Sequence, residues 1–293
     1  MTIDTRSKGM SKRRETREWM PTAPPQLQTA TIVSREFRPP GFWCVGLREP
    51  EIAKNIRPAQ YVAIDLPGGF MMRLPLGVFT ADGEHFTLIF QEWGDRTTRL
   101  AHMAIGETVS FIGPLGNEFA LPRAGSNAII VAGGLGISPF WLLARELHAA
   151  NVNTTIVLGA RSKAYIVGAR ELGTHGFHIE ICTDDGSDGF HGTVVDRVRT
   201  MRRAAIMYGC GPPGMLRALC AFANSEGIRC QISMEETFGC SMGTCWGCVV
   251  AVRRGSTQGT SYPKAPGEQR DFDFARVCAD GTVFDAMDVV WRD

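Results

Sequence analysis

Short runs in which apolar and polar residues alternate fill the chain from Gln26 to Pro122, with Gly, Pro or Asp between them. Typical examples are TATIVSREF, QYVAIDLP and HFTLIFQE. A period of two indicates strands with one buried face, and turn residues at even spacing indicate antiparallel neighbours. We therefore predict an antiparallel barrel in residues 26–124, with a helical pattern only around Thr97 to Met103.

The pattern changes after residue 125. Apolar, β-branched runs such as NAIIVA, NTTIVLGA and AAIMYGC now alternate with segments of helical period such as SPFWLLARELHAAN and PPGMLRALCAFANSEG. Strands that alternate with helices form parallel sheets, because each helix returns the chain to the start of the next strand. Residues 125–233 are therefore predicted to form an α/β domain, in which Ser138 and Pro139 begin the first helix.

The two ends of the chain have neither pattern. Residues 1–25 carry many charges and few apolar groups, which predicts a flexible tail. Residues 234–293 are rich in Cys and Gly and too few to be held together by apolar burial alone, so a small domain with a metal site is expected. The predicted fold is thus multi-domain, with a β part and an α/β part.

Composition excludes several classes of function. Hydrophobic residues make up 44% and charged residues 21%, as in ordinary globular proteins. No apolar run approaches the roughly 20 residues of a membrane span. A net charge of +1 gives no field that would favour nucleic acid or an anionic membrane. The start of the chain lacks the apolar core of a signal peptide, so a cytoplasmic location is predicted.

Four of the nine cysteines lie near the C-terminal end, at Cys240, Cys245, Cys248 and Cys278. C-x4-C-x2-C followed by a distant Cys is the spacing of plant-type 2Fe-2S sites, and thiolates are the soft ligands that such clusters select. A structural zinc site is the alternative, although zinc ligands usually come as two short Cys hooks. The remaining cysteines are expected to be small buried residues, except Cys210, which stands at a glycine-rich strand end.

Two strand ends carry glycine-rich loops. The residues expected to bind a ligand there are Gly133, Gly134, Gly136 and Ile137 in the first loop, and Gly209, Gly211 and Pro212 in the second. Free N–H groups before a helix bind phosphate, and two such ends on the carboxyl edge of one parallel sheet would outline one cleft. Cys210 would lie beside the reacting atoms. For the first loop alone, a tight turn without a ligand is the alternative.

The order of these motifs resembles the ferredoxin reductase-like flavoprotein superfamily, and within it the electron-transfer subunits of NAD-linked, heteromeric dihydroorotate dehydrogenases. The resemblance is carried by GPLGNEF from Gly113, GGLGI from Gly133, TDDGS from Thr183, GCGP from Gly209, the cysteine loop and the closing VCADGTVFD. It implies an FAD-binding barrel, a nicotinamide-binding domain and a small C-terminal 2Fe-2S domain. The cluster ligands would be the four cysteines named above.

The resemblance also implies which residues hold FAD. They are Arg73, Pro75, Leu76, Gly77, Gly94 and Thr97. Arg73 would pair with the FAD pyrophosphate through its planar guanidinium. The chain departs from the family pattern because Leu74 is inserted, Arg96 replaces a glycine, and Gly77 stands where the family has a hydroxyl.

The implied activity is electron transfer between NAD(H), FAD and the cluster, to or from a catalytic partner subunit. That partner would carry FMN and oxidise dihydroorotate in pyrimidine biosynthesis, which makes the assembly a hetero-oligomer. Alternatives are a subunit of a hydrogenase, of a ferredoxin-NADP transhydrogenase or of another redox complex, and a non-catalytic scaffold with a bound metal. NADP(H) stays open, because Arg161 and Ser162 would suit a 2'-phosphate.

Overall fold

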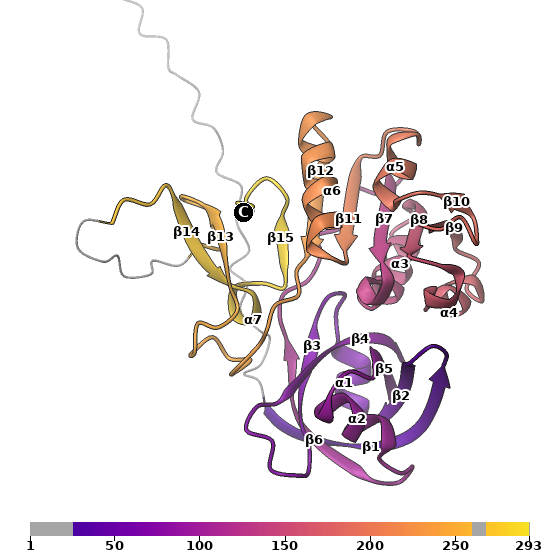
Figure 1. The fold of residues 1–293 in the computed structure, drawn as a ribbon, viewed down its shortest axis with the longest axis vertical. Helices are drawn as coiled ribbons and strands as arrows, with labels where there is room; N and C mark the ends of the chain where they lie inside the picture. The colour runs from indigo at the N-terminus through magenta and orange to yellow at the C-terminus, as the bar shows by residue number, and fades with distance from the viewer. Residues whose placement is uncertain (1–25, 260–267, 293) are drawn as a thin grey trace, which may run out of the picture.

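The described residues, 26–259 and 268–292 of a computed structural model, form three sheets (Figure 1). A closed barrel comes first, a seven-stranded sheet with helices follows, and a two-stranded sheet lies near the C-terminal end. The tail predicted for residues 1–25 lies outside the described residues. In the part of the chain that the structure describes, no helix is both long and apolar enough to cross a membrane.

The barrel has the strand order β1-β2-β5-β4-β3-β6, and β6 closes it against β1 with antiparallel pairing. Residues alternate between its interior and its surface, as in β6, where Val109 and Phe111 are buried and Thr108 is exposed. This alternation confirms the predicted antiparallel barrel. The strands are β1 (Gln26–Arg38), β2 (Phe42–Arg48), β3 (Tyr61–Asp65), β4 (Leu74–Asp82), β5 (His85–Gln91) and β6 (Thr108–Leu115).

Two short helices accompany the barrel. The helix α2 (Asp95–His102) matches the predicted helical pattern, whereas α1 (Pro50–Asn55) was not predicted. The carboxylate of Glu49 caps α1 by accepting a hydrogen bond from the Ile52 N–H at 2.6 Å, and Pro50 opens its first turn. This short helix is stabilised by local capping, which the pattern of apolar residues does not reveal.

The large sheet has the order β10-β9-β8-β7-β11-β12-β15, with parallel pairing from β10 to β12. Alternate residues of β7 belong to two different apolar clusters. Ile130 shares a cluster with residues of α3, and Ile129 shares the other with residues of α5 and α6. Helices therefore cover both faces, which confirms the predicted α/β part. The strands are β7 (Asn127–Gly133), β8 (Asn153–Ala160), β9 (His178–Thr183), β10 (Phe190–His191), β11 (Ile206–Cys210), β12 (Arg229–Ser233) and β15 (Val283–Asp285).

The helical segments around this sheet vary in length. They are η1 (Gly134–Ile137), α3 (Phe140–Ala149), η2 (Lys163–Tyr165), α4 (Ala169–Gly173), α5 (Val194–Arg199) and α6 (Pro213–Ser225). The side chain of Ser138 makes no cap for α3, which begins only after Pro139. The expected capping role of Ser138 is therefore wrong, because a 3-10 turn intervenes and directs its hydroxyl elsewhere.

The sheet is mixed rather than wholly parallel, since β15 pairs antiparallel with β12. This strand comes from the closing segment near the C-terminus, far along the chain from the other strands. It supplies backbone partners to β12, which would otherwise be an exposed sheet edge. The sequence did not indicate this pairing, because β15 is very short.

The C-terminal segment contains β13 (Val249–Arg253) and β14 (Phe272–Arg276), which pair antiparallel, and the short helix α7 (Val277–Asp280). Its apolar residues, among them Val252 and Ala275, belong to the same buried cluster as Leu216 of α6. The segment therefore shares a core with the sheet instead of standing alone. Residues 260–267 of the polar stretch between β13 and β14 lie outside the described residues.

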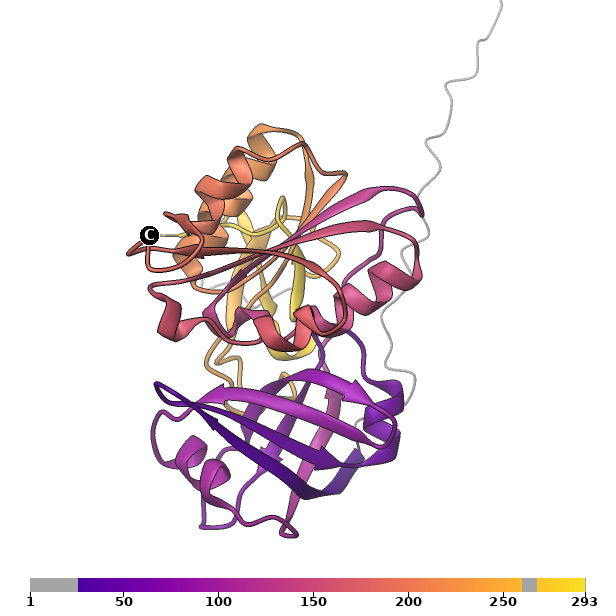
Figure 2. The ribbon, with the colours of Figure 1, turned by 90° about the vertical axis from the view of Figure 1, so that its right-hand side faces the viewer.

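The barrel and the large sheet lie one against the other along the long axis of the molecule (Figure 2). One apolar cluster crosses the junction, and it contains Phe79 of the barrel and Phe140 of α3. The Arg145 side chain of α3 also donates a hydrogen bond to the Ala81 carbonyl at 3.0 Å. The carboxyl edge of the sheet is thus held close to the barrel, and the cavities described next lie along it.

Candidate functional site

The two glycine-rich loops lie side by side, because β7 and β11 pair in parallel with Ala132 opposite Cys210. A side chain at Gly136 would collide with the Cys210 carbonyl, and one at Gly133 would come within 2.8 Å of the Pro212 ring. Glycine is needed at both positions because two backbones meet there. The loops were predicted to outline one cleft, and the structure brings them together.

A cavity of about 730 Å³ opens over these loops, a size typical of small-molecule sites. The predicted residues that line it are Gly133, Gly134, Gly136, Gly211 and Pro212. Ile137 is fully buried in the core, and Gly209 packs under Leu219 of α6, so neither reaches the cavity. The first turn of α6 carries no side-chain cap, and its Pro213 has no N–H, so the groups that could face an anion are the N–H groups of Gly214 and Met215.

The lining of this larger cavity also includes opposite charges. Arg161 follows β8, and its guanidinium carbon lies 3.8 Å above the centre of the Tyr165 ring. Asp184 follows β9 and lines the same cavity. The larger cavity therefore offers a cation, held flat by an aromatic ring, as well as an acid.

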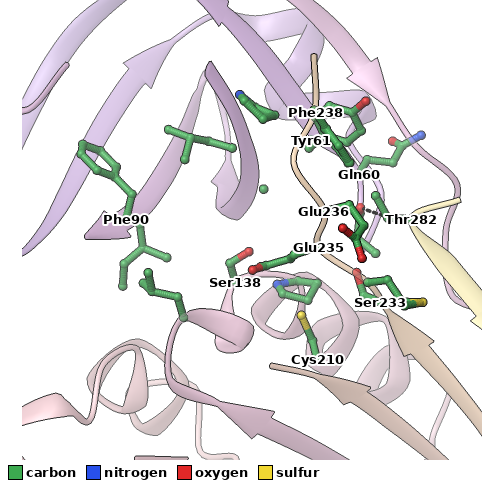
Figure 3. A pocket seen from close by; sticks show the side chains of 18 residues that line it. Gln60, Tyr61, Phe90, Ser138, Cys210, Ser233, Glu235, Glu236, Phe238 and Thr282 are labelled. Atoms are coloured by element: carbon green, nitrogen blue, oxygen red, sulfur yellow. Dashed lines mark hydrogen bonds between the residues drawn. The ribbon is translucent and has the colours of Figure 1, made fainter. Parts of the chain in front are cut away.

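A smaller cavity of about 230 Å³ lies between the barrel and the sheet (Figure 3). The predicted residues Pro75, Leu76 and Gly77 form part of its barrel wall, and Cys210 forms part of its sheet wall. A Cβ atom at Gly77 would lie 2.5 Å from Ser138 Oγ. Ser138 therefore brings a hydroxyl to the place where Gly77 lacks one.

Three other predicted residues lie outside this cavity. Arg73 is half-buried, and its Nε atom is buried without a hydrogen-bond partner among the described residues. Gly94 precedes α2 with φ of 82°, and Thr97 Oγ1 accepts a hydrogen bond from the Trp93 N–H at 2.7 Å. Gly94 and Thr97 thus shape the loop before α2, while Arg73 offers a donor that an anion would satisfy.

Glu235 was not predicted, yet it lines both cavities. It follows β12, and surrounding protein atoms raise the pKa of its carboxyl by desolvation. Desolvation by neighbouring atoms likewise raises the pKa of Glu236, an exposed residue that lines the smaller cavity. Two adjacent acids shortly after the end of β12 were the available signal.

Cys210 has a neutral thiol. Burial raises its pKa well above the ordinary thiol value, although a side-chain hydrogen bond with Ser233 acts in the opposite direction. A thiol that stays protonated is not a nucleophile. Cys210 can therefore contact a ligand in the smaller cavity, but it does not supply a thiolate.

The cysteine loop directs backbone N–H groups at sulfur. The Cys240 sulfur accepts hydrogen bonds from the N–H groups of Met242, Thr244 and Cys245 at 3.2–3.4 Å. The Cys245 sulfur accepts from Cys240 and Gly247, both at 3.4 Å, and the Cys248 sulfur from Cys278 at 3.5 Å. Such bonds stabilise thiolates, which are the form that binds metals.

The four cysteines stand as two hydrogen-bonded pairs, Cys240 with Cys245 and Cys248 with Cys278. Burial opposes ionisation of Cys240, but hydrogen bonds from the Thr244 side chain and from backbone N–H groups lower its pKa to about 6. The hydrogen bond from Cys278 lowers the pKa of Cys248 to about 7, and the same bond raises the pKa of Cys278. Thiolates are thus favoured in each pair.

The other cysteines stand apart from this loop. Cys182, Cys220 and Cys230 are buried, as predicted, and Cys44 is half-buried in the barrel wall. Burial raises the pKa of Cys44 and of Cys182 to about 11. These residues are packing elements.

The chain is 34% identical over 240 residues to a protein of Caldanaerobacter subterraneus subsp. tengcongensis named dihydroorotate dehydrogenase B (NAD(+)), electron transfer subunit, and the match covers 81% of this chain and 89% of that protein. A protein of the same name from Bacillus caldolyticus is 34% identical over 241 residues, or 80% of this chain and 87% of that protein. No family model matches the chain.

Solved structures agree with this relationship. The NADH-dependent reduced ferredoxin-NADP oxidoreductase has a TM-score of 0.76 and 26% identity over 89% of this chain and 90% of that chain. The cytochrome b5 reductase domain of Ulva prolifera nitrate reductase shares the fold, with a TM-score of 0.58 and 17% identity over 69% of this chain and 94% of that chain. The chain therefore belongs to the family of electron transfer subunits of dihydroorotate dehydrogenase B (NAD(+)).

Proposed function

We propose that this chain passes electrons between NAD(H), FAD and a 2Fe-2S cluster, to or from a catalytic partner subunit. The observation that carries the proposal is that single residues join the three candidate binding regions. Glu235 lies in the wall of both cavities, and Tyr61 lines the smaller cavity while its hydroxyl contacts Ser241 of the cysteine loop and Cys278. A flavin between the other two sites is needed, because a nicotinamide gives two electrons together and an iron–sulfur cluster takes one.

The larger cavity is proposed as the nicotinamide site. The loop residues that would face the pyrophosphate are Gly133, Gly134, Gly136, Gly211 and Pro212. The uncapped start of α6 supports this placement, since free N–H groups and the helix dipole favour negative charge. Ile137 and Gly209 would act only by fixing the shape of the loops. The NAD(+) in the names of the relatives supports NAD(H) as the cofactor.

Arg161 is expected to influence the preference between NADH and NADPH. Its stacked guanidinium would attract a 2'-phosphate, while Asp184 in the same cavity would repel one. Arg161→Ala should lower the ratio of kcat/KM for NADPH over NADH by about tenfold, since a charge-assisted hydrogen bond contributes about 1.5–3 kcal/mol. Dye reduction with each cofactor measures the ratio, and the exposed Arg202→Ala is the control. An unchanged ratio would remove Arg161 from the site.

The smaller cavity and its surroundings are proposed to hold FAD, which when bound would convert a hydride into single electrons. Pro75, Leu76 and Gly77 would contact it from the barrel, and Ser138 and Cys210 from the sheet. The Arg73 Nε atom is buried and has no hydrogen-bond partner within residues 26–259 and 268–292, which supports a phosphate nearby because a buried donor needs an acceptor. Gly94 and Thr97 would shape the adjoining loop.

Arg73→Ala should weaken FAD binding by about tenfold or more, because it removes a charge-assisted hydrogen bond to the proposed pyrophosphate. Flavin absorbance after extensive dialysis measures retention. Arg99→Ala is the control, because Arg99 is an exposed arginine of α2. This variant should retain flavin like the wild type. Equal retention in both variants would contradict the role given to Arg73.

Cys240, Cys245, Cys248 and Cys278 are proposed to ligate the 2Fe-2S cluster, and residues 234–293 to form its domain. Two cysteine pairs suit two iron atoms, because a 2Fe-2S cluster is held by four cysteine sulfurs. A zinc ion would need the four sulfurs arranged around one point. The cysteines instead follow the C-x4-C-x2-C spacing with a distant fourth Cys, which favours the cluster over zinc.

The partner proposed is a catalytic subunit that oxidises dihydroorotate, which the names of the relatives support. That this subunit carries FMN is proposed from the family resemblance. We also propose that the protein is cytoplasmic and that its first two domains span residues 26–124 and 125–233. Co-purification from the native source tests the partner. Recovery of a dihydroorotate-oxidising subunit is expected, whereas recovery of a hydrogenase or a transhydrogenase subunit would replace it.

Cofactor analysis of the purified chain tests the proposal as a whole. We expect about one FAD and about two iron atoms per chain, because one flavin site and one binuclear cluster are proposed. Absorbance across the visible range would accompany both. A colourless protein with stoichiometric zinc and no iron would instead indicate a metal-containing scaffold and would refute the electron-transfer role.

A further inference from the structure

Tyr61 joins the smaller cavity to the cysteine loop. Tyr61 is the first residue of β3. Its ring lines the cavity and packs against Phe238, with the ring centres 5.1 Å apart (Figure 3). Its hydroxyl lies in the direction of the loop and donates toward two carbonyl oxygens, that of Cys278 at 3.1 Å and that of Ser241 at 3.2 Å. The residue is only 3% exposed.

The two carbonyls belong to different cysteine pairs. Cys278 is a member of one pair, and Ser241 directly follows Cys240 of the other. Ser241 is 1% exposed and has φ of 59°, a left-handed conformation that a residue with a side chain adopts only when its surroundings hold it there. A single buried hydroxyl from the barrel thus contacts the backbone of both pairs.

Other contacts already attach the closing segment to the barrel. Thr282 Oγ1 donates to the Ala59 carbonyl at 2.7 Å, and Asn117 Nδ2 donates to the Val283 carbonyl at 2.9 Å. The Tyr61 hydroxyl is therefore not needed to keep the segment in place. What it adds is contact with the backbone of one cysteine, Cys278, and of the residue that follows another, Ser241.

We propose that Tyr61 is a positioning residue that holds both cysteine pairs against the smaller cavity and thereby sets how fast electrons pass between flavin and cluster. The inference rests on the proposed function. One hydride from NADH would bring two electrons and one proton to the flavin. The electrons would pass singly to the cluster and on to the partner, the proton would leave the reoxidised flavin for solvent, and Tyr61 would be neither oxidised nor deprotonated. The distance between the flavin, as electron donor, and the cluster, as electron acceptor, governs the rate of such a transfer. Groups around the sulfur ligands also tune the reduction potential of the cluster.

Tyr61→Phe tests the inference, because it removes only the hydroxyl and keeps the ring. The matched control is Tyr208→Phe, since Tyr208 is also fully buried and donates to a backbone carbonyl, that of Ala120, at 2.9 Å, but lines neither cavity. Rapid mixing with NADH gives the rate of flavin bleaching and then the rate of cluster reduction. Redox titration followed by electron paramagnetic resonance gives the cluster potential.

In Tyr61→Phe we expect flavin bleaching at the wild-type rate, cluster reduction slowed by about tenfold and a shifted cluster potential. Tyr208→Phe should match the wild type in all three measurements. Loss of iron from Tyr61→Phe with FAD retained would also support the inference, since the cysteine pairs alone would be affected.

Wild-type cluster reduction and an unchanged potential in Tyr61→Phe would overturn the inference. So would the loss of FAD together with iron, which would indicate a general role in folding. A wild-type protein that contains neither FAD nor iron would be a separate result, because it would refute the proposed function and the inference with it.

Discussion

Cys278→Ser should lose the 2Fe-2S cluster while FAD stays bound, because Cys278 pairs with Cys248 in the cysteine loop and does not line the flavin cavity. NADH should still bleach the flavin, since hydride transfer precedes the cluster. Delivery of electrons to the partner should fall by about 100-fold or more, as metal-site substitutions that alter even supporting residues cost about 10–100-fold. Iron content, flavin content and partner reduction measure the three effects.

Cys44→Ser is the control for this variant, because Cys44 lies in β2, in the wall of the barrel, and is not one of the proposed ligands. It should keep its iron and its electron delivery. If Cys278→Ser retains the paramagnetic signal of the reduced cluster and wild-type delivery, another residue must be the fourth ligand.

Gly136→Ala should have the second largest effect. A methyl group at this position would collide with the Cys210 carbonyl, so the two glycine-rich loops would have to separate. Overpacking of this kind costs about 1–3 kcal/mol of folding free energy. We also expect KM for NADH to rise by about tenfold or more, because a small displacement in a positioning loop is enough to misplace the reacting atoms.

Gly173→Ala is the matched control, since a methyl group there meets no atom within 4 Å and Gly173 lies at the end of α4, away from both cavities. It should be neutral, or stabilising by about 0.4–1 kcal/mol. Urea unfolding and flavin bleaching at increasing NADH compare the variants. Equal stability and equal KM in the two variants would contradict the close contact between the loops.

Local patterns predicted the barrel and the α/β part of the fold. The alternation in β6 and the apolar runs of β7 and β11 depend only on which faces of each strand are buried. The pairing of β15 with β12 was missed, because a three-residue strand has no period and its partner lies far away in sequence. Pairings at long range depend on tertiary packing.

The sequence indicated those parts of the candidate site that belong to a motif. It did not indicate the residues that contribute a single side chain from outside any motif. Spacing identified the four cysteines, and glycine placement identified the two loops. Glu235 and Tyr61 were missed, because only the fold brings a residue after β12 and one in β3 to the same cavity. Ser138 was assigned to a helix cap, although its hydroxyl lies against Gly77 across the junction of barrel and sheet.

Anaerobic titration of the purified protein with NADH tests the central claim most directly, namely that electrons enter at a nicotinamide site and leave through a cluster. The account predicts that flavin absorbance bleaches and that a paramagnetic signal of a reduced 2Fe-2S cluster then grows in, with no partner added. The account would be contradicted if NADH bleached the flavin completely and left an oxidised cluster that dithionite readily reduces, because the cluster would then lie outside the electron path.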